Sequence, residues 1–134
     1  MYLNLAIVVG NLTRDPELRS LSSGQPVTSF SLATNRVWKD KNGERKEQSE
    51  FHTIVVFGKT AESVAQYLKK GDSALVEGRL QTRSWESDGV KKYRTEIVAD
   101  RIQFGTKRSD KDSQADESEG NEELVEEPVE DVPF

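Results

Sequence analysis

Residues 60–71, TAESVAQYLKKG, decide the fold because they interrupt a series of strands with a helical pattern. Val64 and Leu68 fall on one face of a helix, with polar residues on the other side. Thr60 belongs to the residue types that cap helix N-termini, and Gly71 to the type that ends helices. We therefore predict one helix with Thr60 as its N-cap and Gly71 as its C-terminal stop.

The segments on both sides of this helix follow the period of two that is typical of strands. They are rich in β-branched and aromatic residues, which favour strands. Asp88-Gly89, between the last two segments, is a strong hairpin signal. The expected strands are LNLAIVVGNL (3–12), TSFSLATNRVW (28–38), SEFHTIVVFG (49–58), SALVEGRLQTRSW (73–85) and YRTEIVADRIQF (93–104).

Three strands, one helix and two strands follow one another along the chain. This order predicts an OB-fold, a five-stranded Greek-key barrel that is all-β apart from one helix. Such barrels bind oligonucleotides or oligosaccharides, and the fold by itself does not name the ligand. The 134 residues are enough for one such domain and too few for a second.

Charge divides the chain into a basic body and an acidic tail. Residues 1–108 hold 18 Lys and Arg against 13 Asp and Glu, a net charge of +5, whereas residues 109–134 hold 1 against 11, a net charge of −10. The acidic part has too few apolar residues to offset the entropy lost on ordering. We therefore predict a folded domain over residues 1–105 and a disordered tail over residues 106–134. The basic body favours a polyanionic ligand.

Composition excludes most kinds of catalytic site. The chain has no cysteine and 1 histidine, His52, so it can form neither a Cys–His pair nor a His or Cys metal cluster. Gly58-Lys59-Thr60 imitates the end of a phosphate-binding P-loop, but the first glycine of that motif would fall at Thr53, inside a core strand. We interpret His52 as a hydrogen-bonded residue of the core or of a subunit interface. We expect no catalytic residue, no metal and no cofactor.

No segment of the sequence suggests a membrane or a leader peptide. No apolar run approaches the roughly 18 residues that a membrane helix needs. The first strand follows no basic segment and precedes no cleavage signal. We expect a soluble protein of the cytoplasm.

The two faces of the expected strands differ in character. In strand 73–85 the even residues form a small apolar stripe that suits a barrel interior, and the odd residues place Trp85 on the other face with Arg79 and Arg83. In strand 49–58, Phe51 and Phe57 lie on one face. The residues that we expect inside the barrel are Ala74, Val76, Gly78, Leu80, Ile54 and Val56.

Aromatic and cationic residues together predict a surface on which bases stack. Trp38 lies among cations at the end of its strand, as Trp85 does in its own. Each stacked base contributes about 1–3 kcal/mol, while Lys and Arg follow the phosphates. The alternative is that these aromatics are ordinary core residues, which fits Phe51 and Phe57 better than the two tryptophans.

Short motifs run in order through the first 105 residues and resume at residue 131. They are Val9-Gly10-Asn11-Leu12, Asp15-Pro16-Glu17-Leu18-Arg19, Ser31-Leu32-Ala33-Thr34, Lys46-Glu47-Gln48, Phe57-Gly58-Lys59, Tyr67-Leu68-Lys69-Lys70-Gly71, Glu77-Gly78-Arg79-Leu80 and Asp131-Val132-Pro133-Phe134. With these motifs the chain resembles the bacterial single-stranded DNA-binding protein family. The resemblance implies an OB-fold subunit, usually of a homotetramer, that wraps single-stranded DNA without sequence preference during replication, recombination and repair.

The resemblance also implies which residues contact DNA. Bases would stack on Trp38, Phe51, Phe57 and Trp85, with Tyr67 as a weaker candidate. The DNA backbone would contact Arg19, Lys41, Lys59, Lys70 and Arg83, and we add Arg79 because it shares a strand face with Arg83. Phe51 stands where the family often has Trp, and Gln81 and Ser84 stand where basic residues are common. We therefore expect an affinity and a salt sensitivity below those usual for the family.

The last residues of the tail resemble a docking peptide that other genome-maintenance proteins recognise. Phe134 can fill an apolar pocket, Asp131 can meet a basic rim, and Pro133 reduces the entropy lost on binding. The resemblance thus implies that replication, recombination and repair proteins bind Asp131, Val132, Pro133 and Phe134. Family linkers are often long and rich in Gly, Gln or Pro, whereas this tail is short and acidic.

Two other binding functions stay open from the sequence. An OB-fold adaptor of a replication-restart assembly would chiefly bind proteins, and the acidic Pro-Phe tip argues against it. An RNA-binding OB module would contact 2′-hydroxyl groups, and nothing in the sequence marks such contacts. In each case we expect a binding protein associated with the nucleoid, not an enzyme.

Overall fold

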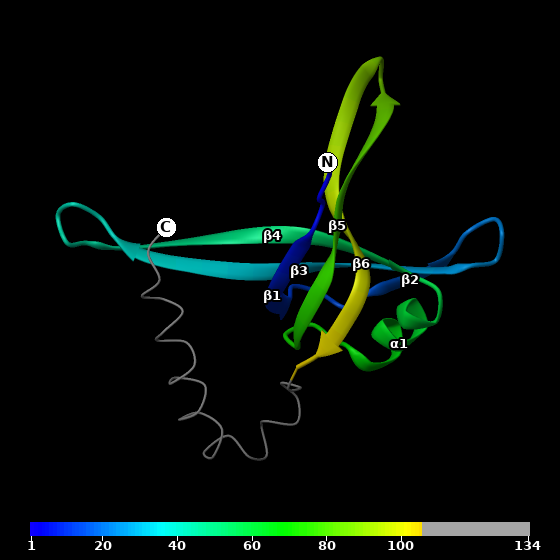
Figure 1. Cartoon of the computed structure of the whole chain (residues 1–134), viewed down its shortest axis with the longest axis horizontal. Helices are drawn as coiled ribbons and strands as arrows, with labels where there is room; N and C mark the ends of the chain where they lie inside the picture. The colour runs from blue at the N-terminus through cyan, green and yellow to red at the C-terminus, as the bar shows by residue number, and fades with distance from the viewer. Residues whose placement is uncertain (106–134) are drawn as a thin grey trace.

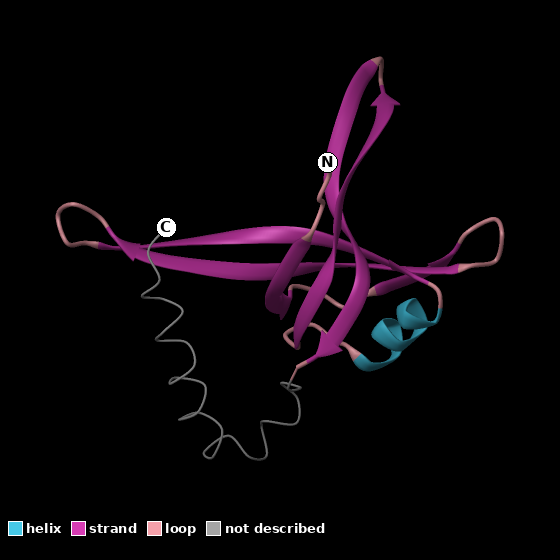
Figure 2. Ribbon diagram, in the orientation of Figure 1, coloured by secondary structure: helices cyan, strands magenta, loops and turns pink. Residues whose placement is uncertain are grey.

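The computed structural model describes residues 1–105, so the predicted tail over residues 106–134 and its docking tip lie outside the described residues. This part of the chain contains six strands and one helix (Figures 1 and 2). Their bounds are β1 Ala6–Leu12, β2 Glu17–Ser20, β3 Pro26–Lys39, β4 Arg45–Phe57, α1 Lys59–Tyr67, β5 Ser73–Ser87 and β6 Val90–Phe104.

The strands form a single sheet that closes into a barrel. Its order is β1-β5-β6-β4-β3-β2, and β1 also pairs with β3. The pairing of β4 with β6 is parallel, and the other pairings are antiparallel. The prediction of a five-stranded OB-type barrel with one helix is confirmed, with the short strand β2 added along β3.

The single helix packs against the barrel but differs from the prediction at both ends. Its N-cap is Gly58, with φ at 78° and no side-chain cap, so Thr60 is not the cap because the chain turns out of β4 before reaching it. The helix ends at Tyr67 because Leu68 is extended and buried in the core. Gly71 belongs to the next turn, where its N–H donates to the Leu12 carbonyl at 2.8 Å.

The residues that the strand period predicted inside the barrel are buried there, except for Leu80. Ile54, Val56, Ala74 and Val76 are at most 2% exposed. The core cluster comprises Leu12, Phe30, Leu32, Ile54, Val56, Ala61, Val64, Leu68, Ala74, Val76 and Ile97. Leu80 was expected inside and is 49% exposed, because β5 runs out of the barrel beyond the register shift between Glu77 and Gly78.

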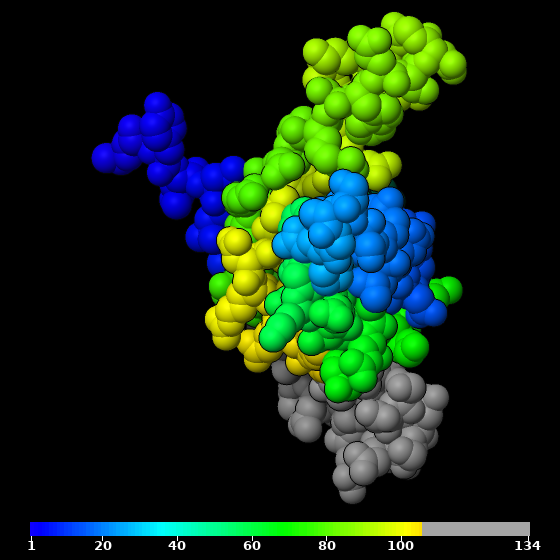
Figure 3. Space-filling model, turned by 90° about the vertical axis from the view of Figure 1, so that its right-hand side faces the viewer, coloured from blue at the N-terminus to red at the C-terminus, as the bar shows by residue number. Residues whose placement is uncertain are grey.

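Two long hairpins project from the barrel (Figure 1). The β3–β4 hairpin pairs from Val27–Phe57 to Lys39–Arg45. The β5–β6 hairpin, which we call the arm over residues 80–97, stands clear of the body in Figure 3. Its predicted turn is confirmed, because Asp88 and Gly89 have φ values of 54° and 77°.

Candidate nucleic-acid interface

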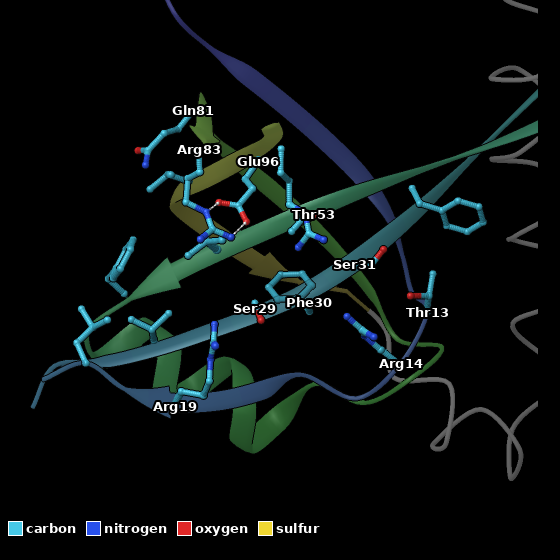
Figure 4. Close-up of a pocket in the computed structure, with 17 residues that line it drawn as sticks. Thr13, Arg14, Arg19, Ser29, Phe30, Ser31, Thr53, Gln81, Arg83 and Glu96 are labelled. Atoms are coloured by element: carbon cyan, nitrogen blue, oxygen red, sulfur yellow. Dashed lines mark hydrogen bonds and ion pairs between the residues drawn. The ribbon is translucent and has the colours of Figure 1, made fainter. Parts of the chain in front are cut away.

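A groove of about 660 Å³ lies between the outer face of β3 and β4 and the base of the arm. Most of its floor is formed by odd-numbered residues of the two strands, because the even-numbered residues face the core; the even-numbered Phe30 also borders it. The remaining walls come from β2, β5, β6 and the segment before β2 (Figure 4). The residues around it are Thr13, Arg14, Arg19, Leu21, Val27, Ser29, Phe30, Ser31, Phe51, Thr53, Val55, Phe57, Gln81, Arg83, Arg94, Glu96 and Val98.

Two phenylalanines present open rings to this groove. Phe51 is 68% exposed and Phe57 is 40% exposed, whereas their neighbours Ile54 and Val56 are buried. The structure thus brings together two of the predicted stacking residues on one strand. Large exposed rings on a strand face are the surface on which nucleic-acid bases stack.

Four arginines line the groove from three sides. Arg14 precedes β2 and Arg19 lies on it, and both reach into the groove from below in Figure 4. Arg83 comes from β5 and Arg94 from β6. Arg19 and Arg83, two of the predicted backbone contacts, thus line the same groove as Phe51 and Phe57, and their contact with DNA stays a prediction. Arginines that surround an aromatic floor suit the phosphates of a single strand whose bases stack on that floor.

Arg83 is held by a nearly buried acid. Its Nε and Nη2 donate to the two carboxylate oxygens of Glu96 at 2.8 and 2.9 Å, and the Glu96 side chain is 4% exposed (Figure 4). These hydrogen bonds, together with the charge of Glu96, raise the pKa of Arg83 above its usual value. Arg83 therefore stays charged, and its guanidinium plane is fixed by a bidentate contact.

Trp85 stands beside the groove on the arm. It is 40% exposed, and the guanidinium carbons of Arg83 and Arg94 each lie 6.0 Å from its ring centroid. The pairing register sets Arg83 opposite Arg94 and Trp85 opposite Lys92, so the same face of the arm carries all four. The predicted combination of Trp85 with cations is present, and it continues the groove outward.

The other predicted contact residues lie outside the groove. Trp38 is near the far end of β3, with the guanidinium of Arg36 at 4.6 Å from its ring. Tyr67 ends α1 and lies 6.4 Å from the ring of Phe104. Arg79 donates to Gln81 at 2.9 Å. Lys41, Lys59, Lys70 and Arg79 are absent from the groove lining, and their roles, with those of Trp38 and Tyr67, stay predictions.

Sequence reasoning missed Arg14, Arg94 and Glu96. A signal for two of them was available, because a two-residue turn at Asp88-Gly89 fixes the register of the arm. That register puts Arg94 opposite Arg83 and Glu96 opposite Gln81. Arg14 lies between β1 and β2, where no strand period applies.

His52 is hydrogen-bonded, as we expected, and the core or interface role that we gave it stays a prediction. Its Nε2 lies 2.9 Å from Thr34 Oγ1, and the residue is partly buried on β4. Over residues 1–105 no three acidic or histidine side chains gather in a way that could hold a metal ion. The same residues include no helix of the length and apolarity needed to cross a membrane.

Comparison with known protein families gives one consistent result. The model of the single-strand binding protein family matches residues 3–105. The single-stranded DNA-binding protein of Staphylococcus aureus strain MRSA252 is 51% identical over 115 residues, which cover 85% of this chain and 72% of that protein. Single-stranded DNA-binding protein 1 of strain Mu50 is 50% identical over the same shares of the two chains.

Two solved structures have the same fold. The Plasmodium falciparum SSB in complex with ssDNA superposes with a TM-score of 0.75 at 32% identity, over 79% of this chain and 97% of that one. A deletion mutant of the single-stranded DNA binding protein from Thermus aquaticus superposes with a TM-score of 0.71 at 33% identity, over 79% of this chain and 52% of that one.

Proposed function

The chain belongs to the single-strand binding protein family and is a single-stranded DNA-binding protein, not an enzyme, and from this premise we propose that the groove beside β4 is where it holds DNA. One observation carries the proposal: the groove combines two open phenylalanine rings with four arginines. Stacking uses the faces of the bases, which all bases share, so binding is independent of sequence.

The proposal gives roles to the aromatic residues in and beside the groove and to two of its arginines. Phe51 and Phe57 stack bases, and Trp85 stacks a further base where the strand leaves the groove along the arm. Arg14 and Arg19 contact phosphates on the β2 side. The support is that the two phenylalanines and the two arginines line one concave surface, and that Trp85 lies beside two further arginines of that surface, Arg83 and Arg94.

A longer strand continues beyond the groove over the remaining predicted residues. Trp38 lies on the β3–β4 hairpin opposite Lys46 and beside Arg36, so this hairpin offers a second site of stacked ring and cation. The proposed outer contacts are Trp38, Tyr67, Lys41, Lys59, Lys70 and Arg79. They would give a binding site that extends with the length of the DNA.

We also propose a homotetramer, in line with the resemblance. Leu5, just before β1, and Ile7 and Val9 on β1 form an apolar row of alternate residues that are 57–60% exposed. Within the described chain β1 pairs with β3 only at residues 11 and 12, which leaves its other edge open over residues 6–10. An apolar row beside an open strand edge is the kind of surface that a second copy covers.

The tail completes the proposed function. Asp131, Val132, Pro133 and Phe134 dock proteins of replication, recombination and repair, and the protein works in the cytoplasm with the nucleoid. A peptide of residues 126–134 should bind a purified replication, recombination or repair protein, and the same peptide with Phe134→Ala should not. Equal binding by the two peptides would contradict the docking role.

The DNA-binding proposal is tested by titrating intrinsic Trp fluorescence with oligo(dT) of increasing length, in low and then high salt. Single strands should quench it in proportion to length up to a limit, matched duplex should not, and salt should weaken the effect as counterions are released. Competition with ribo-oligonucleotides separates an RNA-binding module, because such a module would prefer RNA.

A double variant tests the two tryptophans. Trp38→Ala with Trp85→Ala should lower the affinity for labelled oligo(dT), measured by fluorescence anisotropy, by more than about tenfold, because two stacked bases are lost. Binding equal to the wild type at fixed salt would show that the tryptophans are structural. The proposed stacking of bases on Trp38 and Trp85 would then be wrong, while the groove, which neither tryptophan lines, would be tested separately by its phenylalanines.

A further inference from the structure

Glu96 is the one acidic residue among those that line the groove, where the four other charged residues are arginines. Its side chain is 4% exposed, and both oxygens are engaged by Arg83 at 2.8 and 2.9 Å (Figure 4). A carboxylate repels the phosphates that a DNA groove attracts. Its presence there requires a role other than affinity.

The pair that Glu96 forms has no net charge. The bidentate geometry compensates for the loss of water around the carboxylate. The Arg83 side chain is 53% exposed, so its guanidinium faces the groove while its charge is balanced from behind. Arg83 therefore offers DNA a fixed planar group and only a small net attraction.

Arg94 differs from Arg83 although the two are direct neighbours across the arm. The pairing register sets them opposite each other, and both guanidinium carbons lie 6.0 Å from the Trp85 ring centroid. Like charges directly opposite on a ladder destabilise it, and Glu96 relieves this by neutralising one of them. Among residues 1–105, Arg94 has no ion pair comparable to that of Arg83.

We propose that Glu96 is a positioning residue that fixes Arg83 as a neutral pair, so that Arg94 supplies the charge that this part of the arm gives to the DNA backbone. The inference rests on the proposed groove and adds a division of labour between two facing arginines. It also gives the protein a salt dependence below what its count of groove arginines suggests.

The salt dependence of binding measures this division directly. For a single strand, each phosphate contact that releases a counterion adds about 0.7 to the slope of log affinity against log salt. Glu96→Gln keeps the shape of the side chain and one acceptor for Arg83, but it removes the balancing charge. The double variant Arg83→Gln/Glu96→Gln removes the pair and leaves the net charge unchanged.

The experiment measures the affinity of the full chain for labelled oligo(dT) of one length by anisotropy over a tenfold range of salt. Glu96→Gln should bind more tightly in low salt and show a slope steeper by about 0.7, so that the tenfold range weakens it about fivefold more than the wild type. Arg94→Gln should show a slope shallower by about 0.7. The Arg83→Gln/Glu96→Gln double variant should keep the wild-type slope.

Lys91→Gln provides the matched control. Lys91 stands opposite Glu86 in the strand register, on the face of the arm that points away from the groove. The substitution Lys91→Gln therefore removes one charge from the same hairpin without touching the groove. An equal loss of slope in Lys91→Gln and Arg94→Gln would overturn the assignment to Arg94. A wild-type slope in Glu96→Gln, or a loss in the double variant as large as in Arg94→Gln, would overturn the role of Glu96.

Folding and the proposed groove are checked separately. Thermal melting by circular dichroism shows whether each variant folds, and the double variant and Arg94→Gln still decide the question if Glu96→Gln alone does not fold. If Phe51→Ala and Phe57→Ala bind oligo(dT) like the wild type, the groove is wrong and this inference falls with it. If they bind weakly and the slopes do not change as described, this inference alone is wrong.

Discussion

Val56 and Phe57 are consecutive in β4, but Val56 belongs to the core and Phe57 to the proposed DNA-binding groove. Val56 is 2% exposed and Phe57 is 40% exposed, because successive side chains of a strand point to opposite faces. We expect Phe57→Ala and Phe51→Ala each to lower the affinity for oligo(dT) by about 5- to 150-fold at fixed salt, which corresponds to about 1–3 kcal/mol of stacking. Anisotropy titrations with labelled DNA measure both.

Two variants control this prediction. Phe57→Tyr keeps an aromatic ring and should retain most of the affinity. Tyr93→Ala removes an exposed ring from the face of the arm that Trp85 does not occupy, and it should bind like the wild type. If Tyr93→Ala weakens binding as much as Phe57→Ala does, a specific stacking role for the groove is untenable.

The sequence predicts which face of its strand a residue of the site occupies, because side chains alternate between the two faces with a period of two. Phe51 and Phe57 follow from alternation along β4, and Arg83 and Trp85 follow from alternation along β5. Glu96 was missed because alternation within a strand says nothing about what stands opposite, which only the turn at Asp88-Gly89 fixes. An ion pair between two strands can therefore be predicted only from the register, and the pattern of each strand alone does not show it.

At the scale of elements, Gly78 of β5 lies close against β6, next to the register shift between Glu77 and Gly78. A Cβ added to Gly78 would lie 2.1 Å from the Val98 carbonyl oxygen, and backbone at that place cannot move aside easily. We expect Gly78→Ala to lower the free energy of unfolding by about 2–3 kcal/mol, because overpacking forces the strands apart. Urea denaturation followed by circular dichroism measures the change.

The control for Gly78 is a glycine in open space. Gly89 has nothing within 4 Å of an added Cβ, and its φ of 77° is one that Asn tolerates. Gly89→Asn should therefore change the free energy of unfolding by no more than about 1 kcal/mol. A comparable loss in both variants would mean that the close approach at Gly78 is not the cause.

The elements themselves were largely predictable, and their ends were not. The period of two predicted the five barrel strands, and the period of 3.6 predicted α1. β2 was missed because its four residues are all exposed and carry no alternation. The extension of β4 back to Arg45 was missed because these residues are polar and pair only across their own hairpin.

At the scale of the whole molecule, the proposed homotetramer rests on the exposed apolar row at β1. We expect Val9→Glu to weaken self-association, because a charge on the covered face would lose its water without gaining a partner. Analytical ultracentrifugation should then show smaller species than the wild type forms at the same concentration, where we expect the proposed homotetramer. Val90→Glu is the control, since Val90 is equally open, at 59% exposed against 60% for Val9, but lies at the tip of the arm. Unchanged assembly in Val9→Glu would place the interface elsewhere.

Charge also acts across the whole molecule, because the tail carries −10 and residues 1–108 carry +5. A polyanionic segment tethered to a basic groove competes with DNA for it, and this competition weakens as salt shortens the Debye length from about 30 Å at 0.01 M to about 10 Å at 0.1 M. Removing residues 109–134 should therefore raise the affinity for oligo(dT) several-fold in low salt and leave it nearly unchanged in high salt.

A variant with the tail's Asp and Glu replaced by Asn and Gln should behave like the deletion, because it keeps the length and loses the charge. If the variant with the neutral tail binds DNA like the wild type, the tail acts by excluded volume and not by charge. If deletion of the tail lowers the affinity, the tail supports DNA binding instead of competing with it.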